Sequence, residues 1–73
     1  MTELKDYKLE IAINIRRARL AKKYSQDYLA AGLNISQNAY SKIERGYTKL
    51  TLRHAFIIAD ILKADVLTIL RPG

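Results

Sequence analysis

The spacing of apolar positions along the chain predicts a succession of short helices. Between residues 6 and 22, Tyr7, Ile11, Ile15 and Ala18 fall on one side of a helix with 3.6 residues per turn. Shorter segments with the same period begin near residues 25, 36, 51 and 65. Each follows a Ser, Thr or Asp, whose side-chain oxygen accepts from the free N–H groups of a first helical turn. The pattern therefore predicts an all-α fold.

The segment from residue 25 to residue 46 contains two short helices joined by a tight turn. Ser25 is the expected cap of the first helix, and Ala30 is small enough for close helix packing. Asn34 stands at the turn, because after Gly it best tolerates the left-handed conformation. Ser36 is expected to cap the second helix and Gly46 to end it.

The second of these helices has two different faces. Ala39, Tyr40 and Ile43 group on one side and are expected to face the core, and Glu44 lies toward the same side. The opposite side carries amide, hydroxyl and ammonium groups: Gln37, Asn38, Ser41 and Lys42. Amide side chains pair with adenine edges in a major groove, and Lys donates to guanine acceptors. This layout predicts a helix that contacts bases.

These residues resemble a helix-turn-helix domain of the phage repressor/Cro type, also called the xenobiotic-response-element family. The resemblance covers about residues 11 to 70 and is carried by Ser25-Gln26, Leu29-Ala30, Ile35-Ser36 and Ile43-Glu44-Arg45-Gly46. It implies a five-helix, lambda-repressor-like domain with Gln26 and the start of the third helix facing DNA. The family's architectural ion pair stands here as Arg19 and Glu44.

Three positions depart from the family's usual glycines: Lys23, Asn34 and Lys63. Each left-handed residue of this kind costs about 1 kcal/mol, which leaves the fold intact.

Polar residues around the helix-turn-helix are candidates for contacts with DNA phosphates. Gln26 lies in a first helical turn, where its side chain and the free N–H groups can hold a phosphate together. Tyr28 projects sideways, either along the DNA backbone or over the core. The loop after Gly46 is either solvated or a backbone clamp, and we favour the clamp. Its candidate residues are Arg45, Tyr47 and Lys49.

Apolar residues outside the expected core indicate a homodimer. The inward stripe of the fourth helix is expected to be Leu52, Ala55, Phe56, Ala59 and Leu62. Ile57 and Ile61 point away from that stripe, and Leu67 occupies a site that is polar in the resembled family. We interpret these three as a dimer interface, and scattered surface aliphatics are the alternative. Leu9, Ile13 and Leu20 form a second stripe on the first helix, which contacts either the ends of the chain or a partner.

The composition narrows the classes of function. The chain of 73 residues is expected to form one domain, and its formal net charge of +6 favours a polyanionic partner, either DNA or an anionic membrane. Simple solubility is the alternative. No apolar run approaches about 18 residues, so we expect no membrane span and a cytoplasmic protein. There is no Cys, and His54, expected at the edge of the Ile57 and Ile61 patch, is the only histidine. We therefore expect no metal and no cofactor.

These features together predict a sequence-specific regulator of transcription, a repressor or controller, that binds double-stranded DNA. A dimer would place two third helices in successive major grooves, so the operator is expected to be near-palindromic. The alternative is a protein-interaction module, for example an antitoxin-like partner. An enzyme is not expected, because the chain has no paired carboxylates in register and no phosphate-binding glycine loop.

Overall fold

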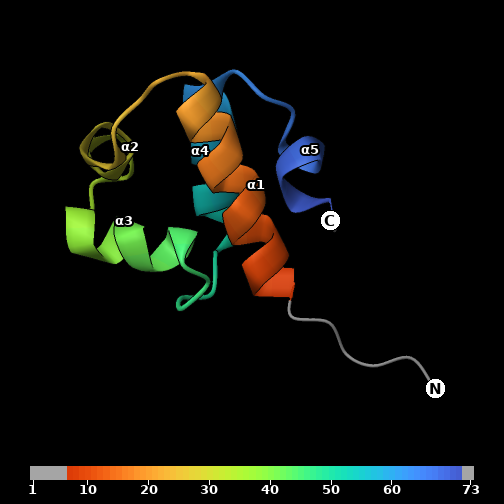
Figure 1. Cartoon of the computed structure of the whole chain (residues 1–73), viewed down its shortest axis with the longest axis horizontal. Helices are drawn as coiled ribbons and strands as arrows, with labels where there is room; N and C mark the ends of the chain where they lie inside the picture. The colour runs from red at the N-terminus through yellow and green to blue at the C-terminus, as the bar shows by residue number, and fades with distance from the viewer. Residues whose placement is uncertain (1–6, 72–73) are drawn as a thin grey trace.

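The computed structural model describes residues 7–71, which form five helices and, within that range, no strand. The helices are α1 (Tyr7–Ala21), α2 (Gln26–Leu33), α3 (Gln37–Glu44), α4 (Leu52–Leu62) and α5 (Val66–Leu70). Figure 1 shows α1 crossing in front of α4, with α2 and α3 on one side and α5 on the other. The predicted all-α class is confirmed.

The four helices after α1 all begin at the residue that the sequence predicts as a cap. In each case the side-chain oxygen accepts a hydrogen bond from a backbone N–H in the first turn. The four caps are Ser25 to the N–H of Tyr28, Ser36 to Ala39, Thr51 to His54 and Asp65 to Leu67. Such a bond satisfies one of the donors that a helix start leaves free, so local sequence fixes where each helix begins.

Left-handed residues end three of the helical segments. Lys23, Asn34 and Lys63 have φ angles of 61°, 59° and 55°. The N–H of Asn34 donates to the carbonyls of Ala30 and Ala31, which closes the end of α2. These bonds satisfy carbonyls that would otherwise face solvent or core unpaired, and they offset part of the steric cost of the conformation.

Every helix contributes at least one large side chain to a single core. The fully buried large side chains are Ile15, Leu29, Tyr40, Ile58, Leu62 and Ile69. Ile15 lies in the inward stripe predicted for α1, where Ile11 and Ala18 are half-buried. The side chain of Tyr7, assigned to the same stripe, lies outside the described residues. The amide of Asn14 also joins α1 to α5, because it donates to the carbonyls of Ile69 at 2.8 Å and Arg71 at 2.7 Å.

The inward face of α4 differs from the one predicted. Leu52 and Phe56 are 64% and 54% exposed, and Ile58, which the pattern left out, is fully buried. The buried stripe is Ala55, Ile58, Ala59 and Leu62. Because α4 is apolar around most of its circumference, two stripes at helical spacing compete, and only packing against α2 and α5 selects one.

The predicted outward orientation of Ile57 and Ile61 is also wrong. Both are half-buried and pack against the protein's own core. A Cβ atom added at Gly32 would lie 2.4 Å from Cδ1 of Ile61, so this side chain rests directly on α2. Leu67, the third residue assigned to the dimer interface, is 70% exposed.

Candidate nucleic-acid interface

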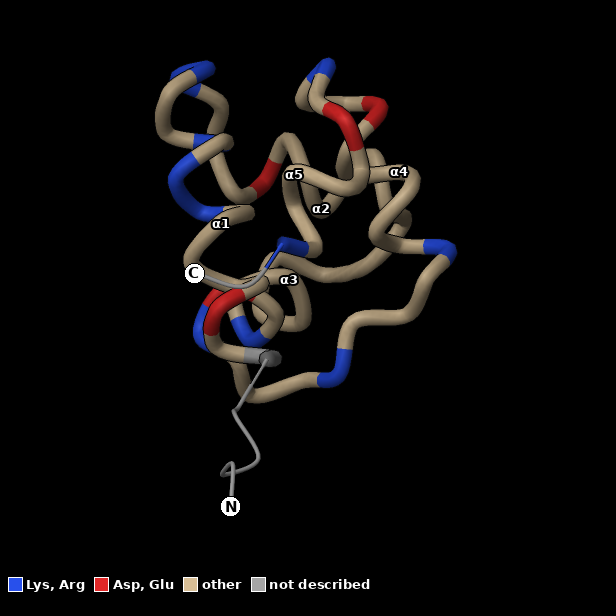
Figure 2. The backbone as a smooth tube through the Cα atoms, turned by 90° about the vertical axis from the view of Figure 1, so that its right-hand side faces the viewer, with Lys and Arg blue, Asp and Glu red and all other residues tan. Residues whose placement is uncertain are grey.

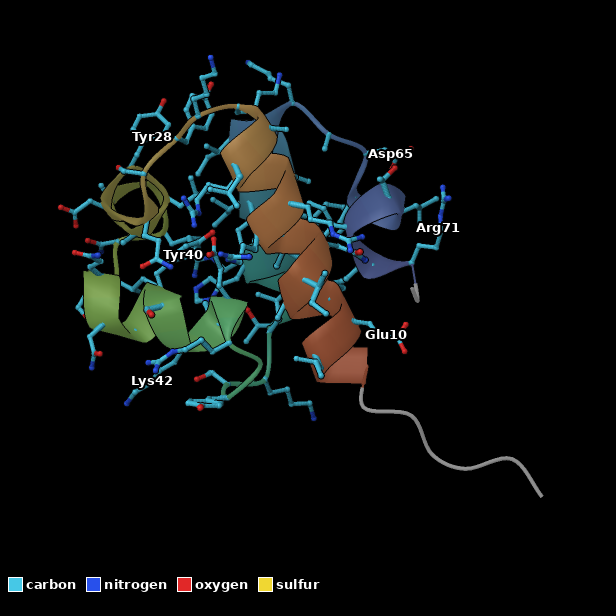
Figure 3. The ribbon with its side chains drawn as sticks, in the orientation of Figure 1. Glu10, Tyr28, Tyr40, Lys42, Asp65 and Arg71 are labelled. Atoms are coloured by element: carbon cyan, nitrogen blue, oxygen red, sulfur yellow. The ribbon has the colours of Figure 1, made fainter. Side chains whose placement is uncertain are left out.

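The two faces of α3 differ in their exposure to solvent. Tyr40, Ile43 and Glu44 are 0%, 5% and 5% exposed. On the other side Gln37, Asn38 and Lys42 are exposed and Ser41 is half-exposed. In Figure 3, Tyr40 points toward α1 while Lys42 points away from the body of the protein. The outer face of α3 therefore presents two amides, a hydroxyl and an ammonium group to solvent, and no carboxylate.

A buried ion pair fixes the end of α3 to α1. Nε of Arg19 lies 2.6 Å from Oε2 of Glu44, and Nη2 of Arg19 donates to Oε1 at 3.0 Å. The geometry is bidentate, which orients both groups as well as joining them. Nη1 of Arg19 also donates to the carbonyl of Tyr24 at 2.8 Å, so the same guanidinium holds the segment that leads into α2.

Glu44 accepts from two further side chains. The hydroxyl of Tyr40 donates to Oε2, and Nε2 of Gln26 donates to Oε1 at 3.2 Å. Burial alone would raise the pKa of Glu44, but the hydrogen bonds from Arg19, Tyr40 and Gln26 outweigh it and hold the pKa below its ordinary value. Burial, together with the hydrogen bond to Glu44, raises the pKa of Tyr40. The hydrogen bond to Glu44 likewise raises the pKa of Arg19. The carboxylate is thus kept ionised inside the fold, paired with Arg19, and does not lie on the outer face of α3.

Gln26 therefore has an internal partner as well as a position facing outward. Its amide nitrogen carries two hydrogens, and one of them is used on Glu44. The side chain is half-buried at the start of α2. The network orients the amide before any ligand arrives, because Glu44 is itself fixed by Arg19.

Tyr28 lies away from the core. Its side chain is 55% exposed, and its ring packs against Tyr24 with centroids 4.7 Å apart and planes tilted by 51°. Figure 3 shows Tyr28 on the outer side of α2. Of the two alternatives left by the sequence, an exposed tyrosine agrees with a surface role and not with covering the core.

The loop after α3 carries the remaining candidates for backbone contacts. Cζ of Arg45 lies 4.9 Å from the centroid of the Tyr47 ring, a cation–π arrangement. Tyr47 is 70% exposed and Lys49 is also exposed. Gly46, between Arg45 and Tyr47, has a φ of 76°, and a Cβ there would lie 3.3 Å from the Cα of Leu9. The loop is therefore held close to α1, and it leaves its cation and aromatic ring facing solvent.

A groove opens between α3, this loop and the start of α4. Its volume is about 520 Å³. The lining residues are Ile35, Ser36, Asn38, Ala39, Lys42, Ile43, Thr48, Lys49, Thr51 and His54. His54, expected at the edge of the Ile57 and Ile61 patch, also lines this groove with Asn38 and Lys42. Sequence reasoning missed this because the groove is made by three segments whose relative placement depends on the whole fold.

The basic residues are distributed over the molecule. Figure 2 shows Lys and Arg positions on several separate parts of the chain, including the end of α1, and not on α3 alone. None of the helices in residues 7–71 is long and apolar enough to cross a membrane. The described residues also hold no cluster of three or more His, Cys, Asp or Glu residues in position to bind a metal ion.

A model of the helix-turn-helix family of the Cro/C1 type matches residues 15–68. The chain belongs to this family. The match spans α2, the turn and α3, together with the helices that support them. Membership in this family supports a DNA-binding transcriptional regulator. No curated protein sequence matches the helix-turn-helix chain significantly.

Two solved structures share the fold of this helix-turn-helix protein. The restriction-modification controller protein C.AhdI from Aeromonas hydrophila is 23% identical, with a TM-score of 0.78, over 84% of this chain and 92% of that one. A hypothetical transcription factor NHTF from Neisseria is 26% identical, with a TM-score of 0.82, over 100% of this chain and 87% of that one. The first likeness, at this level of identity, concerns the fold alone.

Proposed function

We propose that this helix-turn-helix protein is a sequence-specific transcriptional regulator that inserts α3 into the major groove of double-stranded DNA. The observation that carries the proposal is the outer face of α3. Gln37, Asn38 and Lys42 are exposed there without any acidic neighbour on the same face. Together with Ser41 they match the donors and acceptors that base edges present in a major groove.

The ion pair beneath this face supports the proposal. A side chain can distinguish bases only if the helix that carries it is held in one orientation. Glu44 at the end of α3 is bound by Arg19 of α1 and by Gln26 of α2. The three helices around the site are therefore linked by side-chain hydrogen bonds as well as by apolar packing.

Backbone contacts would come from residues on both sides of α3. We assign this role to Gln26 and Tyr28 on α2 and to Arg45, Tyr47 and Lys49 in the following loop. Contacts with phosphates set the position of the protein on DNA and supply most of the salt-dependent affinity. The formal net charge of +6 fits such binding.

The regulator is proposed to act as a homodimer, and we propose an interface that differs in part from the one predicted from the sequence. Ile57 and Ile61 are half-buried and pack against the core of their own protomer. Leu52, Phe56 and Leu67 are large, apolar and 54–70% exposed on α4 and α5. Large exposed apolar residues are common in protein interfaces, so these three are the candidates for the dimer contact. A two-fold dimer would bind two half-sites about 34 Å apart, which makes a near-palindromic operator the expected target.

The test of the proposed function is selection of bound sequences from a pool of random duplex DNA at a stated salt concentration. We expect a motif with two-fold symmetry and half-sites separated by about one helical turn. An unsymmetric motif would contradict the dimer but not base-specific binding. No enrichment over scrambled competitor DNA would contradict the proposed function itself.

A protein-interaction module remains the second candidate, and one specific observation favours it. Leu9, Ile13 and Leu20 form a stripe on α1 and are 47%, 41% and 49% exposed. This surface lies outside the proposed dimer contact on α4 and α5. A module of this kind, for example an antitoxin-like one, would bind a partner protein through α1 and need not distinguish DNA sequences, so the same selection experiment separates the two candidates.

A further inference from the structure

The described residues leave a stripe of apolar side chains on α1 largely uncovered. Leu9, Ile13 and Leu20 are all exposed. Figure 1 shows α4 behind α1, α3 on one side of it and α5 on the other, so no described helix covers its remaining face. Asn14 holds the end of α5 through the carbonyls of Ile69 and Arg71, from a position about 100° around the helix from Ile13. The described C-terminal end of the chain is therefore attached to another face of α1.

The spacing of this stripe is that of a seam between paired helices. Leu9, Ile13, Arg16 and Leu20 are separated by four, three and four residues, which is the a and d repeat of a coiled coil. At the rise of an α-helix, the seam from Leu9 to Leu20 is about 16 Å long. A narrow row of this kind fits one helix lying alongside α1 better than it fits a flat surface.

Arg16, within the seam, determines what such a helix must carry. Its side chain is exposed, and among residues 7–71 no carboxylate pairs with it. A helix that covered the seam would bury this guanidinium, and a buried cation without a partner is strongly unfavourable. The incoming helix is therefore expected to place a carboxylate opposite Arg16. Arg17, exposed next to it, favours acidic residues along the same edge.

The same charge argues against a second copy of α1 as the occupant of the seam. In a parallel pair of α1 helices Arg16 would face its own counterpart, and facing like charges are strongly unfavourable. In an antiparallel pair Arg16 would face Ile13, which offers no carboxylate. Glu10, the acidic residue within α1, is half-buried and lies about 100° around the helix from Leu9, so it supplies no counter-charge at Arg16.

We propose that the outer face of α1 binds an amphipathic helix of a partner protein. Apolar residues of that helix face Leu9, Ile13 and Leu20, and one of its carboxylates faces Arg16. This goes beyond the proposed DNA-binding function, because it uses α1 and not α3, and it gives a partner class to the surface on which the second candidate function rests. Charge complementarity at Arg16 then selects the partner, while the apolar contacts supply most of the affinity.

The probe is a synthetic amphipathic helical peptide of about three heptads, with leucine in its seam and one glutamate at the central seam position. Fluorescence anisotropy measures its binding to the full chain, and NMR of the isotope-labelled protein locates the contact. We expect chemical-shift changes centred on the outer face of α1. A second peptide, in which lysine replaces that glutamate, should bind roughly tenfold more weakly, because it sets two cations against each other.

A charge reversal on the protein tests the central contact. Arg16→Glu should reverse the preference, so that the lysine peptide binds roughly tenfold more tightly than the glutamate peptide. Arg53→Glu is the matched control, because Arg53 is exposed on α4 and the same change in net charge should leave the preference for glutamate intact. Leu20→Asp should weaken the binding of the glutamate peptide. All three side chains are exposed, and circular dichroism verifies that each variant is folded.

Several results would overturn the proposed docking site while leaving the DNA-binding function standing, which is tested separately by selection from random duplexes. These are equal binding of the two peptides, no binding of either, and shift changes centred on Leu52, Phe56 and Leu67. Self-association that Leu20→Asp abolishes would also overturn it, in favour of a second copy. Binding to phosphatidylserine vesicles that requires Leu20, without any preference between the peptides, would overturn it in favour of a membrane surface. A preference for glutamate that Arg16→Glu reverses and Arg53→Glu keeps supports it.

Discussion

Arg19 and Glu44 are 25 residues apart in the sequence, yet they are joined by two hydrogen bonds inside the core. The pair links the last turn of α1 to the last residue of α3. Loss of the pair is therefore expected to lower the stability of the fold and also to loosen the orientation of the outer face of α3, which we propose contacts DNA.

Replacing Arg19 with methionine should strongly destabilise the protein. Arg19→Met preserves much of the side-chain volume but leaves the Glu44 carboxylate buried without its cation, which costs about 3–5 kcal/mol. Urea denaturation followed by circular dichroism measures the loss. Arg16→Met is the control, because Arg16 is exposed on the same helix and should change the free energy of unfolding by less than about 0.5 kcal/mol. If the two substitutions lowered the free energy of unfolding equally, the buried ion pair would contribute no more to stability than an exposed arginine does.

The lowered pKa of Glu44 predicts how this contribution varies with pH. A carboxyl whose pKa is lower in the folded state stabilises the fold fully at pH values above its ordinary pKa of 4.5, and the stabilisation is lost as the pH falls through the folded value. Glu44→Gln should therefore be clearly less stable than the unmodified protein at pH 7, and the difference should shrink below pH 4.5. Thermal unfolding of both proteins across this range tests the sign. A difference that widened in acid would refute the assigned direction.

The left-handed lysines predict that two substitutions stabilise the protein. Lys23 and Lys63 have positive φ angles that glycine adopts without steric cost. Lys23→Gly and Lys63→Gly should each raise the free energy of unfolding by about 0.5–1 kcal/mol, because the relieved strain exceeds the extra flexibility of the unfolded chain. Ala31→Gly, at an exposed position inside α2, should instead lower it by about 1 kcal/mol. Chemical denaturation of the three variants gives the comparison.

These features show how far local sequence determines this fold. The caps at Ser25, Ser36, Thr51 and Asp65 were predictable, because a cap needs only its own side chain and the next few backbone groups. The left-handed turn at Asn34 was predictable for the same reason. Interactions of this kind span a few residues, so they can be found without knowing the tertiary structure.

The orientation of α4 was not predictable in the same way. Phe56 was assigned to the core and Ile57 to the surface, and the structure reverses their order of exposure. A helix that is apolar on most sides has no polar face to mark solvent, so its rotation is set by its neighbours. In the candidate site, the spacing of polar residues within α3 was enough to predict its outer face. The position of His54, in contrast, depends on how α3, the following loop and α4 meet.

The reassigned dimer surface gives a prediction that separates the two apolar surfaces. Phe56→Asp places a charge in the proposed interface, and should convert the proposed dimer to a monomer because a carboxylate buried there without a partner is strongly unfavourable. Leu20→Asp changes the stripe on α1 instead and should leave the dimer intact. Sedimentation of both variants at micromolar concentration, with circular dichroism to verify folding, distinguishes them. A dimer lost only in Leu20→Asp would move the interface to α1.

The proposed division of work between α3 and the following loop predicts two different losses of DNA affinity. Gln37→Ala removes a proposed base contact, so it should cost about 1–3 kcal/mol on the selected duplex, and much less on random DNA. Lys49→Ala removes a proposed phosphate contact, so it should weaken binding to both duplexes similarly and reduce the salt slope by about one ion per protomer. Titrations of each variant on both duplexes at several salt concentrations measure these terms separately. Both residues are exposed, so neither substitution disturbs the core. If each variant lost as much affinity for random DNA as for the selected duplex, the proposed division between base contacts and phosphate contacts would be wrong.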